Sequence, residues 1–306
     1  MDTKIAISQS FSLRQVLLDR FLRRGLKARL TSQSLDDRHP RVVFANEFIG
    51  METFLAGTYE RNHLLILERV AKALQQYKTE VTFVDVGANI GVHTRFLSKS
   101  VGRVLSFEPN HEVLPILEYN TSDLKNVTIH ALALSNHVGT AALSRSHTWN
   151  KGTASLEQPN SEGAVEVETA TLDSWLAPNG SVDLIKLDVE GHELAVLTGA
   201  VATLSRCRPI VALEQRDEEF DGTGRETPSI RLLRSLGYEL YSPSFYSPSF
   251  DTKRLVRVLG RLLNFVKLAA FRKRVWSLHL CQEVPRGLYP LLVAIPAEAA
   301  SELALF

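Results

Sequence analysis

Short apolar runs alternate with helix-like stretches along the chain from position 81 onward. Runs rich in β-branched residues predict strands, and segments whose apolar residues recur every three or four positions predict helices. This alternation is typical of a mostly parallel sheet covered by helices. We predict strands at 81–86, 103–107, 127–133, 182–188, 209–214, 238–241 and 290–295, with helices at 60–78, 91–100, 111–119, 191–204 and 228–236.

The seven predicted strands define an α/β fold of the Rossmann-like type, with helices on both faces of the sheet. Residues 1–45 form a separate basic, amphipathic N-terminal extension, in which leucines recur every four positions from Leu18 to Leu30. We therefore predict two parts, the extension at 1–45 and one large domain at 46–306.

A tandem pentapeptide, Tyr-Ser-Pro-Ser-Phe, occupies 241–250. Its prolines exclude a regular helix or a central strand. It begins an insertion at about 242–290 that also contains a basic amphipathic helix at 253–274. If the strand at 238–241 runs parallel to the others, the insertion leaves the sheet at its carboxyl edge, where ligands bind in open α/β folds. The insertion is then either a substrate lid or a surface decoration.

The composition narrows the class of protein. The chain has 306 residues, of which 44% are hydrophobic and 23% charged, and this excludes collagen-like, coiled-coil and largely disordered chains. Cys207 and Cys281 lack metal-ligand spacing, so neither a zinc site nor a disulfide framework is expected. No apolar run reaches about 18 residues, and the first residues do not resemble an export signal. We expect a cytoplasmic protein.

Charge is distributed unevenly around the overall value of +1. The net charge is +5 over 1–41, −9 over 42–250 and +7 over 251–275. Both basic segments are amphipathic, so each either packs its apolar stripe on the main domain or lies peripherally on an anionic membrane. The acidic central segment would repel phosphates, and this argues against a nucleic-acid partner. The oligomeric state is not indicated by the sequence.

A glycine turn follows the first predicted strand. There Asp85, Gly87, Asn89 and Gly91 form the pattern Asp-x-Gly-x-Asn-x-Gly between a buried strand and a helix. Glycines allow a tight turn whose free N–H groups face a ligand. Glu108 stands at the end of the next strand, where a carboxylate can accept hydrogen bonds from both ribose hydroxyls of a nucleoside. Together these features predict a site for an adenosine-type ligand.

The spacing of the glycines favours one such ligand. A dinucleotide fingerprint is G-x-G-x-x-G, whereas this turn lacks the third glycine and carries Asp85. An acid there would repel a pyrophosphate but can accept a hydrogen bond from an ammonium group. S-adenosyl-L-methionine carries both an ammonium and a cationic sulfur, so we predict it as the cofactor. A nicotinamide or flavin site and a purely structural turn are the alternatives.

A second polar cluster ends the strand predicted at 182–188. Alternation along a strand points Lys186, Asp188 and Glu190 to one side at the carboxyl end, and His192 follows them. Methyl transfer to a hydroxyl needs positioning and a base. We predict His192 as that base, because its ordinary pKa is closest to neutrality. Asp188 and Glu190 are alternatives, either as the base or as ligands of a divalent cation, and the sequence does not indicate whether the reaction depends on a metal.

A structural interpretation of the same residues stays open. Glutamates 190 and 193 can stabilise the start of the following helix through its dipole, with His192 as a solvated first-turn residue. The Asn/Asp-Pro-Pro-aromatic motif often seen in amino-group methylases is absent after this strand, and its absence favours oxygen as the methyl acceptor.

Together these motifs resemble the FkbM-type methyltransferases over about residues 55–215. The resemblance implies the class I methyltransferase fold, with a seven-stranded sheet whose last strand is antiparallel. It also implies O-methylation of a hydroxyl on a sugar, glycolipid or other natural product, with Ser155 near the transfer site. The motifs are Gly57–Glu60, Asp85–Gly91, Phe107–Asn110, Gly152–Leu156, Thr171–Asp173 and Ile185–Gly191 with Glu193.

Three segments have no counterpart in this resemblance: the basic extension, the tandem pentapeptide and the basic helix at 253–274. Contacts specific to the acceptor would be built there. A lipid-linked saccharide at a membrane surface would account for both basic segments. Two other functions stay open, a nicotinamide-dependent oxidoreductase and a non-catalytic scaffold that binds S-adenosyl-L-methionine.

Overall fold

The computed structural model describes residues 38, 42–44, 49–50, 52–53, 58–144, 154–157, 163–176, 180–220, 226–246 and 275–300. The predicted N-terminal extension lies almost entirely outside these residues. The basic helix predicted at 253–274 and most of the second copy of the pentapeptide also lie outside them.

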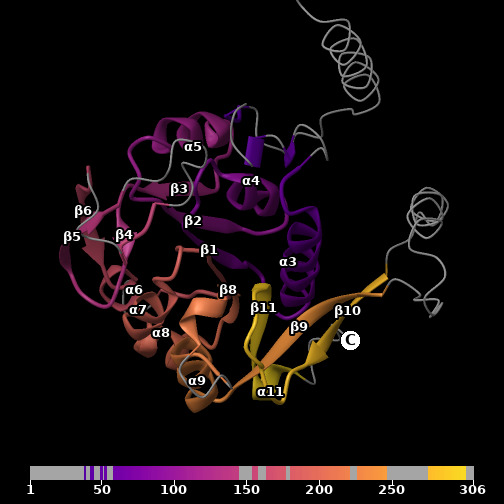
Figure 1. Ribbon diagram of the computed structural model, residues 1–306. Helices are drawn as coiled ribbons and strands as arrows, with labels where there is room; N and C mark the ends of the chain where they lie inside the picture. The colour runs from indigo at the N-terminus through magenta and orange to yellow at the C-terminus, as the bar shows by residue number, and fades with distance from the viewer. Residues whose placement is uncertain are drawn as a thin grey trace, which may run out of the picture.

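A central sheet of eight strands organises the described part of the chain (Figure 1), in the order β10-β9-β11-β8-β7-β1-β2-β3. The five strands from β8 to β3 are parallel, and β11 runs antiparallel to both β8 and β9. The predicted mostly parallel α/β fold with an antiparallel last strand is therefore confirmed. The strands are β1 (Thr82–Val86), β2 (Arg103–Phe107), β3 (Val127–His130), β7 (Leu184–Leu187), β8 (Ile210–Gln215), β9 (Tyr238–Tyr246), β10 (Val275–Leu280) and β11 (Tyr289–Pro296).

The sheet has one strand more than predicted because β9 continues past its partner β11. Residues 238–241 of β9 pair with β11, whereas 241–246 pair with β10 in antiparallel register. Pro243 lies opposite Leu278 in this second part. A residue without an N–H is tolerated there because β9 has a single neighbour at that point. The predicted insertion therefore begins as a two-stranded ribbon, and it leaves the sheet at the carboxyl edge, since β9 runs in the same direction as β8.

A small second sheet was not predicted. It has the order β4-β6-β5 and lies beside the end of the main sheet that carries β3 (Figure 1). The strand predicted at 127–133 is in fact two strands, because the chain changes sheets after His130. The apolar pattern continues across this change, so the sequence gives no sign of it. The strands are β4 (Ala133–Leu134), β5 (Gly139–Leu143) and β6 (Val165–Ala170).

Helices cover both faces of the main sheet. Phe83 of β1 packs in the cluster that contains α3 and α4, and its neighbour Val84 packs in the opposite cluster with α7, α8 and α9. The helix predicted at 191–204 is in fact two helices, which are separated at Gly199 and Ala200. An added Cβ on Gly199 would stand 2.0 Å from the carbonyl oxygen of Ser135, so this position accepts only glycine. The helices are α3 (Arg61–Leu74), α4 (Val92–Ser98), α5 (Leu114–Thr121), α6 (Leu172–Trp175), α7 (Glu193–Thr198), α8 (Val201–Cys207), α9 (Pro228–Ser235) and α11 (Ala297–Ala300).

Each helix in the described ranges is too short or too polar to cross a membrane.

The carboxyl ends of β2, β1, β7 and β8 lie side by side in the sheet order. The loops that leave these four ends therefore meet at one edge of the sheet.

Candidate active site

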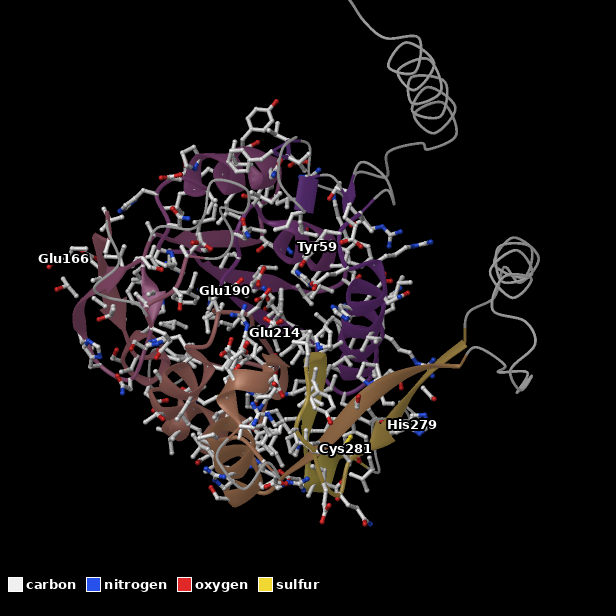
Figure 2. The ribbon with its side chains drawn as sticks, viewed as in Figure 1. Tyr59, Glu166, Glu190, Glu214, His279 and Cys281 are labelled. Carbon is white, nitrogen blue, oxygen red and sulfur yellow. The ribbon has the colours of Figure 1, made fainter. Side chains whose placement is uncertain are left out.

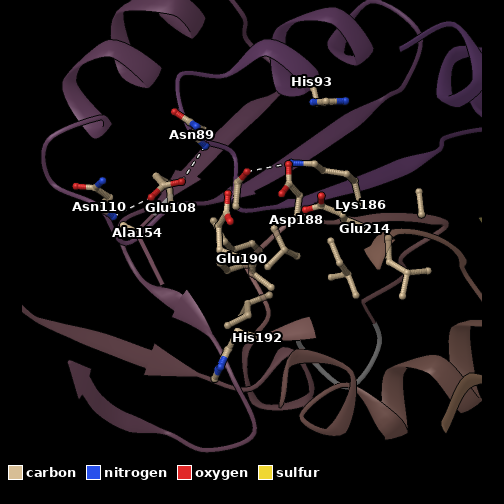
Figure 3. Close-up of a pocket in the computed structure, with 18 of the residues that line it drawn as sticks. Asn89, His93, Glu108, Asn110, Ala154, Lys186, Asp188, Glu190, His192 and Glu214 are labelled. Atoms are coloured by element: carbon tan, nitrogen blue, oxygen red, sulfur yellow. Dashed lines mark hydrogen bonds and ion pairs between the residues drawn. The ribbon is translucent and has the colours of Figure 1, made fainter. Parts of the chain in front are cut away.

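An open cavity lies at the carboxyl edge of the sheet and has a volume of about 1260 Å³, including solvent at its mouth. Its walls come from the ends of β1, β2, β7 and β8, from the start of α3, and from residues 154 and 156. Figure 3 shows Glu108 on one side of this cavity, with Lys186, Asp188 and Glu214 grouped on the other. A cavity at the carboxyl ends of parallel strands is the usual ligand site of open α/β folds.

The glycine turn forms the part of the wall that follows β1. Gly87, Asn89 and Gly91 have φ values of 77°, 49° and 85°, so three residues of the turn adopt the left-handed conformation. A Cβ on Gly87 would lie 2.0 Å from the carbonyl oxygen of Asp188, so only glycine lets the two loops approach. Gly87 and Asn89 line the cavity. Gly91 does not line it; Gly91 is the N-cap residue of α4, and an added Cβ there would lie 2.7 Å from Leu117.

Glu108 is held at the cavity wall by two backbone donors. The amides of Asn89 and Asn110 each donate to one of its carboxylate oxygens, both at 2.8 Å (Figure 3). Burial raises the pKa of Glu108 to about 7, although both backbone bonds lower it. Each carboxylate oxygen has a second lone pair, so both can still accept a hydrogen bond from a ligand. This arrangement fits a vicinal diol such as a ribose.

Asp85 does not reach the cavity, contrary to the expectation that it accepts from a ligand ammonium. Its side chain is fully buried and lies between Thr94 of α4, which donates at 2.7 Å, and Lys186 of the adjacent strand, whose ammonium is 3.4 Å away. The register pairs Asp85 with both Lys186 and Ser106. Asp85 therefore belongs to a buried polar row that crosses three strands beneath the glycine turn.

Lys186 connects this buried row to the cavity. Its ammonium lies 3.4 Å from Asp85 and 3.3 Å from Asp188, and it donates to the carbonyl of Gly87 at 3.0 Å. Burial alone would lower the pKa of Lys186, but Asp188 and Asp85 raise it above its ordinary value. The group is therefore a permanent cation that holds the two loops together, and it cannot accept a proton from a substrate.

Glu190 and His192 line the cavity with partners of their own. The Arg216 guanidinium donates to the Glu190 carboxylate. The two nitrogens of His192 lie 2.6 Å from a Glu157 carboxylate oxygen and 2.9 Å from the Ser135 hydroxyl. The predicted base would have to release one of these bonds to accept a proton. The geometry shows His192 fastening the segment at 154–157 to the loop after β7, and Ser155 adds a bond to the Glu190 carbonyl at 2.8 Å.

Sequence reasoning gave no role to several residues that line the cavity. Glu214 lies near the end of β8 beside Asp188, and Tyr59 and Glu60 immediately precede α3. The pKa of Glu214 is raised to about 8. Burial is the largest cause, and the negative charges of Asp188 and other nearby carboxylates raise this pKa further. The position of Glu214 at the carboxyl end of a predicted strand was the signal that could have identified it. Tyr59 and Glu60 precede the sheet, and only the packing of α3 brings them to its edge.

Within the described ranges, no group of three or more His, Cys, Asp and Glu side chains is arranged to hold a metal ion. Asp188 and Glu190, the alternative cation ligands, face Lys186 and Arg216 respectively.

Residues 85–240 match the family model described as "Methyltransferase FkbM domain". This match covers half of the chain, and the chain therefore belongs to the FkbM methyltransferase family. S-adenosyl-L-methionine is the methyl donor of this class of enzyme, and the pair of oxygens on Glu108 beside the Gly87 turn fits its ribose.

Two characterised relatives share part of the sequence. The 2-O-methyltransferase NoeI of Sinorhizobium fredii is 27% identical over 165 residues, which cover 47% of this chain and 68% of NoeI. The hexuronic acid methyltransferase AglP of Haloferax volcanii is 33% identical over 136 residues, which cover 43% of this chain and 54% of AglP. The aligned segment thus spans little more than half of AglP.

Solved structures resemble the chain more distantly. The methyltransferase FkbM of Methylobacillus flagellatus aligns with a TM-score of 0.33 at 21% identity, covering 44% of this chain and 32% of that protein. An O-methyltransferase of Bacillus cereus in complex with SAH aligns with a TM-score of 0.37 at 12% identity, covering 96% of this chain and 94% of that one.

Proposed function

We propose that this chain is an S-adenosyl-L-methionine-dependent O-methyltransferase that acts on a hydroxyl of a saccharide. The observation that carries the proposal is Glu108, which two backbone amides fix at the wall of a cavity beside the Gly87 turn. A carboxylate with both oxygens available at this place is suited to bind a ribose. The names of NoeI and AglP, a 2-O-methyltransferase and a hexuronic acid methyltransferase, support oxygen and a sugar as the acceptor.

The residues that line the cavity have different roles in binding the cofactor. Glu108 would accept from the ribose hydroxyls, while Gly87 and Asn89 leave the space that the donor needs. Lys186 keeps the turn and the loop after β7 in place through Gly87 and Asp188. When bound, S-adenosyl-L-methionine supplies an activated methyl group on a cationic sulfur. Asp188, Glu190 and Glu60 surround the far part of the cavity with negative charge, which stabilises such a cation.

The far part of the cavity also suits a polyhydroxylated acceptor. Carboxylates accept strong hydrogen bonds from hydroxyl groups, and Asp188, Glu190 and Glu214 all line this part. No Asn/Asp-Pro-Pro-aromatic motif follows Asp188, in keeping with oxygen rather than nitrogen as the acceptor atom. Membrane contact through the basic segments stays a prediction, because those segments lie outside the described residues.

A binding experiment tests the cofactor site. Calorimetric titration with S-adenosylhomocysteine should give binding to the wild type and a loss of about 100-fold or more in Glu108→Ala, because at least two charge-assisted hydrogen bonds of roughly 1.5–3 kcal/mol each are removed. Glu118→Ala, on the exposed side of α5, is the control and should bind like the wild type. Equal affinity of the two variants for S-adenosylhomocysteine would contradict the proposal. Tight binding of NADH without binding of S-adenosylhomocysteine would also contradict it.

A transfer experiment tests the reaction. Methyl-labelled S-adenosyl-L-methionine is incubated with a panel of methyl glycosides that differ in the position of their free hydroxyls. Label should appear in an ether linkage on at least one glycoside. Cofactor binding without transfer to any glycoside would instead support the non-catalytic scaffold.

A further inference from the structure

Glu214 is the second-last residue of β8 and lies where a methyl acceptor would enter the site. The register pairs Leu187 of β7 with Leu213 of β8, so Asp188 and Glu214 are the next residues on the two neighbouring strands. Both continue the face of the sheet that carries Lys186 and Ala212, because side chains alternate along a strand. Both line the cavity.

The place of Glu214 in the sheet separates it from the ribose position. Glu108 follows β2, and the strand order β8-β7-β1-β2 puts three strand spacings between the two carboxylates. At roughly 4.8 Å per spacing this is about 14 Å. A nucleoside held by Glu108 therefore directs its sulfur-bearing end toward β1 and β7, and the acceptor is left with the region around Glu214.

Glu214 is held less tightly than Lys186, Glu190 and His192, which also line the cavity. Lys186 stays protonated between Asp85 and Asp188, Glu190 is bound by Arg216, and His192 contacts a partner at each nitrogen. Among the described residues, Glu214 accepts no hydrogen bond, and its ion pair is with the Arg216 Nε at 3.6 Å. Figure 2 shows Glu214 in the middle of the molecule, with Glu190 and Tyr59 nearby in the same view.

We infer that Glu214 is the residue that takes the proton from the acceptor hydroxyl. This inference rests on the proposed function. The hydroxyl oxygen forms a new bond to the methyl carbon while the carbon–sulfur bond breaks, and the electron pair of that bond passes to sulfur, which becomes a neutral thioether. The hydroxyl proton moves to the Glu214 carboxylate and later leaves to water. Atoms and charge balance without a metal ion or any further reactant.

The surroundings of Glu214 make its carboxylate a stronger base than a surface glutamate. The charged neighbours of Glu214 come from several elements: Lys186 on β7, Asp188 directly after β7, Arg216 after β8, Glu193 on α7, and Glu60 before α3. Burial and then the negative charges raise the pKa of Glu214 to about 8, and Lys186 opposes them. A base whose pKa lies near the working pH is efficient in proton transfer. Turnover should therefore increase with pH and level off above about pH 8.

The test compares Glu214→Gln with the wild type, using the glycoside to which the wild type transfers its methyl group. Loss of a general base reduces the rate by roughly 10²- to 10⁴-fold, so kcat should fall by that factor and the acidic limb of its pH profile should disappear. The dissociation constant of S-adenosylhomocysteine should stay within about twofold. Glu166→Gln, on β6 of the small sheet at the periphery in Figure 2, is the isosteric control and should keep both the rate and the limb.

A measurement without turnover complements this test. Carbon-13 NMR of protein labelled at the glutamate carboxyl carbons should show a signal that titrates near pH 8 in the wild type and is missing in Glu214→Gln. A Glu214 signal titrating between pH 4 and 5, or a kcat reduced less than about fivefold, would overturn the inference. So would turnover that EDTA abolishes and Mg²⁺ restores in the wild type but not in Glu214→Gln, since Glu214 would then be a cation ligand. Failure of the proposed function would appear differently, as a wild type that binds no cofactor.

Discussion

Asp85 and Glu108 show how the same functional group acquires different surroundings at neighbouring strand ends. Asp85 is the fourth residue of β1, and its side chain is buried between Thr94 of α4 and Lys186 of β7. Glu108 comes after the last residue of β2, where the chain has left the sheet and two backbone amides turn the carboxylate toward the cavity. A shift of a few residues along a strand therefore decides between a buried structural group and a carboxylate at the cavity wall.

Gly87 offers the sharpest test of backbone geometry at a single position. In Gly87→Ala, the new Cβ would meet the Asp188 carbonyl at 2.0 Å in a backbone conformation with φ 77°. We expect the free energy of unfolding to decrease by roughly 1–3 kcal/mol and cofactor binding to be lost, because the two loops must separate. Urea denaturation and calorimetry measure the two effects.

Gly287→Ala is the matched control for this substitution, because the atom nearest to its added Cβ is 3.8 Å away. Its free energy of unfolding should stay within about 0.5 kcal/mol of the wild type. Unchanged cofactor affinity in Gly87→Ala would show that the close approach of the two loops is unimportant for the site.

The segment at 154–157 is held at the cavity wall by side-chain contacts. It joins the cavity wall through Ser155, which bonds the Glu190 carbonyl, and through Glu157, which contacts His192. His192 also contacts Ser135, so one imidazole connects three parts of the chain. The sequence placed His192 near the transfer site, but a neutral pKa alone could not show that both nitrogens would be occupied.

His192→Ala distinguishes this structural role from that of a base. If His192 fastens the segment at 154–157, its loss should reduce kcat by less than about tenfold and should increase amide hydrogen exchange in that segment. Loss of a general base would instead reduce kcat by roughly 10²- to 10⁴-fold. Hydrogen-exchange mass spectrometry and steady-state kinetics provide the two readouts.

The control for this variant is His137→Ala, since His137 is exposed and contacts its neighbour Asn136. It should change neither the exchange at 154–157 nor kcat. A large loss of kcat in His192→Ala with unchanged exchange would restore His192 as the base and would contradict the role inferred for Glu214.

Taken as one structure, the protein places several carboxyl groups where burial opposes their ionisation. Burial raises the pKa of Glu193 to about 7, with Glu219 adding to the effect, and Glu108 and Glu214 reach about 7 and about 8. Between the ordinary glutamate pKa and these values, the folded protein keeps protons that the unfolded chain has released. The contribution of these three groups to the free energy of unfolding therefore decreases as pH rises from about 5 to about 8, whereas buried His93, whose pKa burial lowers, contributes in the opposite direction below about pH 6.5.

Glu193→Gln tests this linkage, because Glu193 is nearly inaccessible to solvent and does not line the cavity. One such group contributes a slope of at most about 1.4 kcal/mol per pH unit. The variant should lose stability less steeply than the wild type between pH 5 and pH 7, by up to about that amount per unit. Urea denaturation at intervals of half a pH unit measures the slope.

Exposed Glu168 on β6 provides the control, since Glu168→Gln should keep the slope of the wild type. Parallel stability curves for Glu193→Gln and the wild type, or a variant that loses stability more steeply than the wild type, would contradict the sign of this linkage.

The sequence by itself determined the parallel core of the fold and the glycine turn after β1. β1, β2, β7 and β8 follow the predicted strands closely, because their apolar runs are bounded by polar and glycine residues that appear within a few positions. The residues Gly87, Asn89 and Glu108 were identified for the same reason, since their meaning depends on neighbours in the chain.

Only the tertiary structure decided which side chains share a space. Several contacts at the cavity join segments that are far apart in sequence. They are the ion pair of Lys186 with Asp85, the two contacts of His192, the approach of Glu60 to the sheet edge and the position of Glu214 beside Asp188. The eighth strand arose in the same way, from the pairing of 241–246 with 275–280. The pattern of apolar and polar residues within one helix or strand shows which of its residues must be buried. It does not show strand register or loop packing, and these determine the surroundings of each ionisable group.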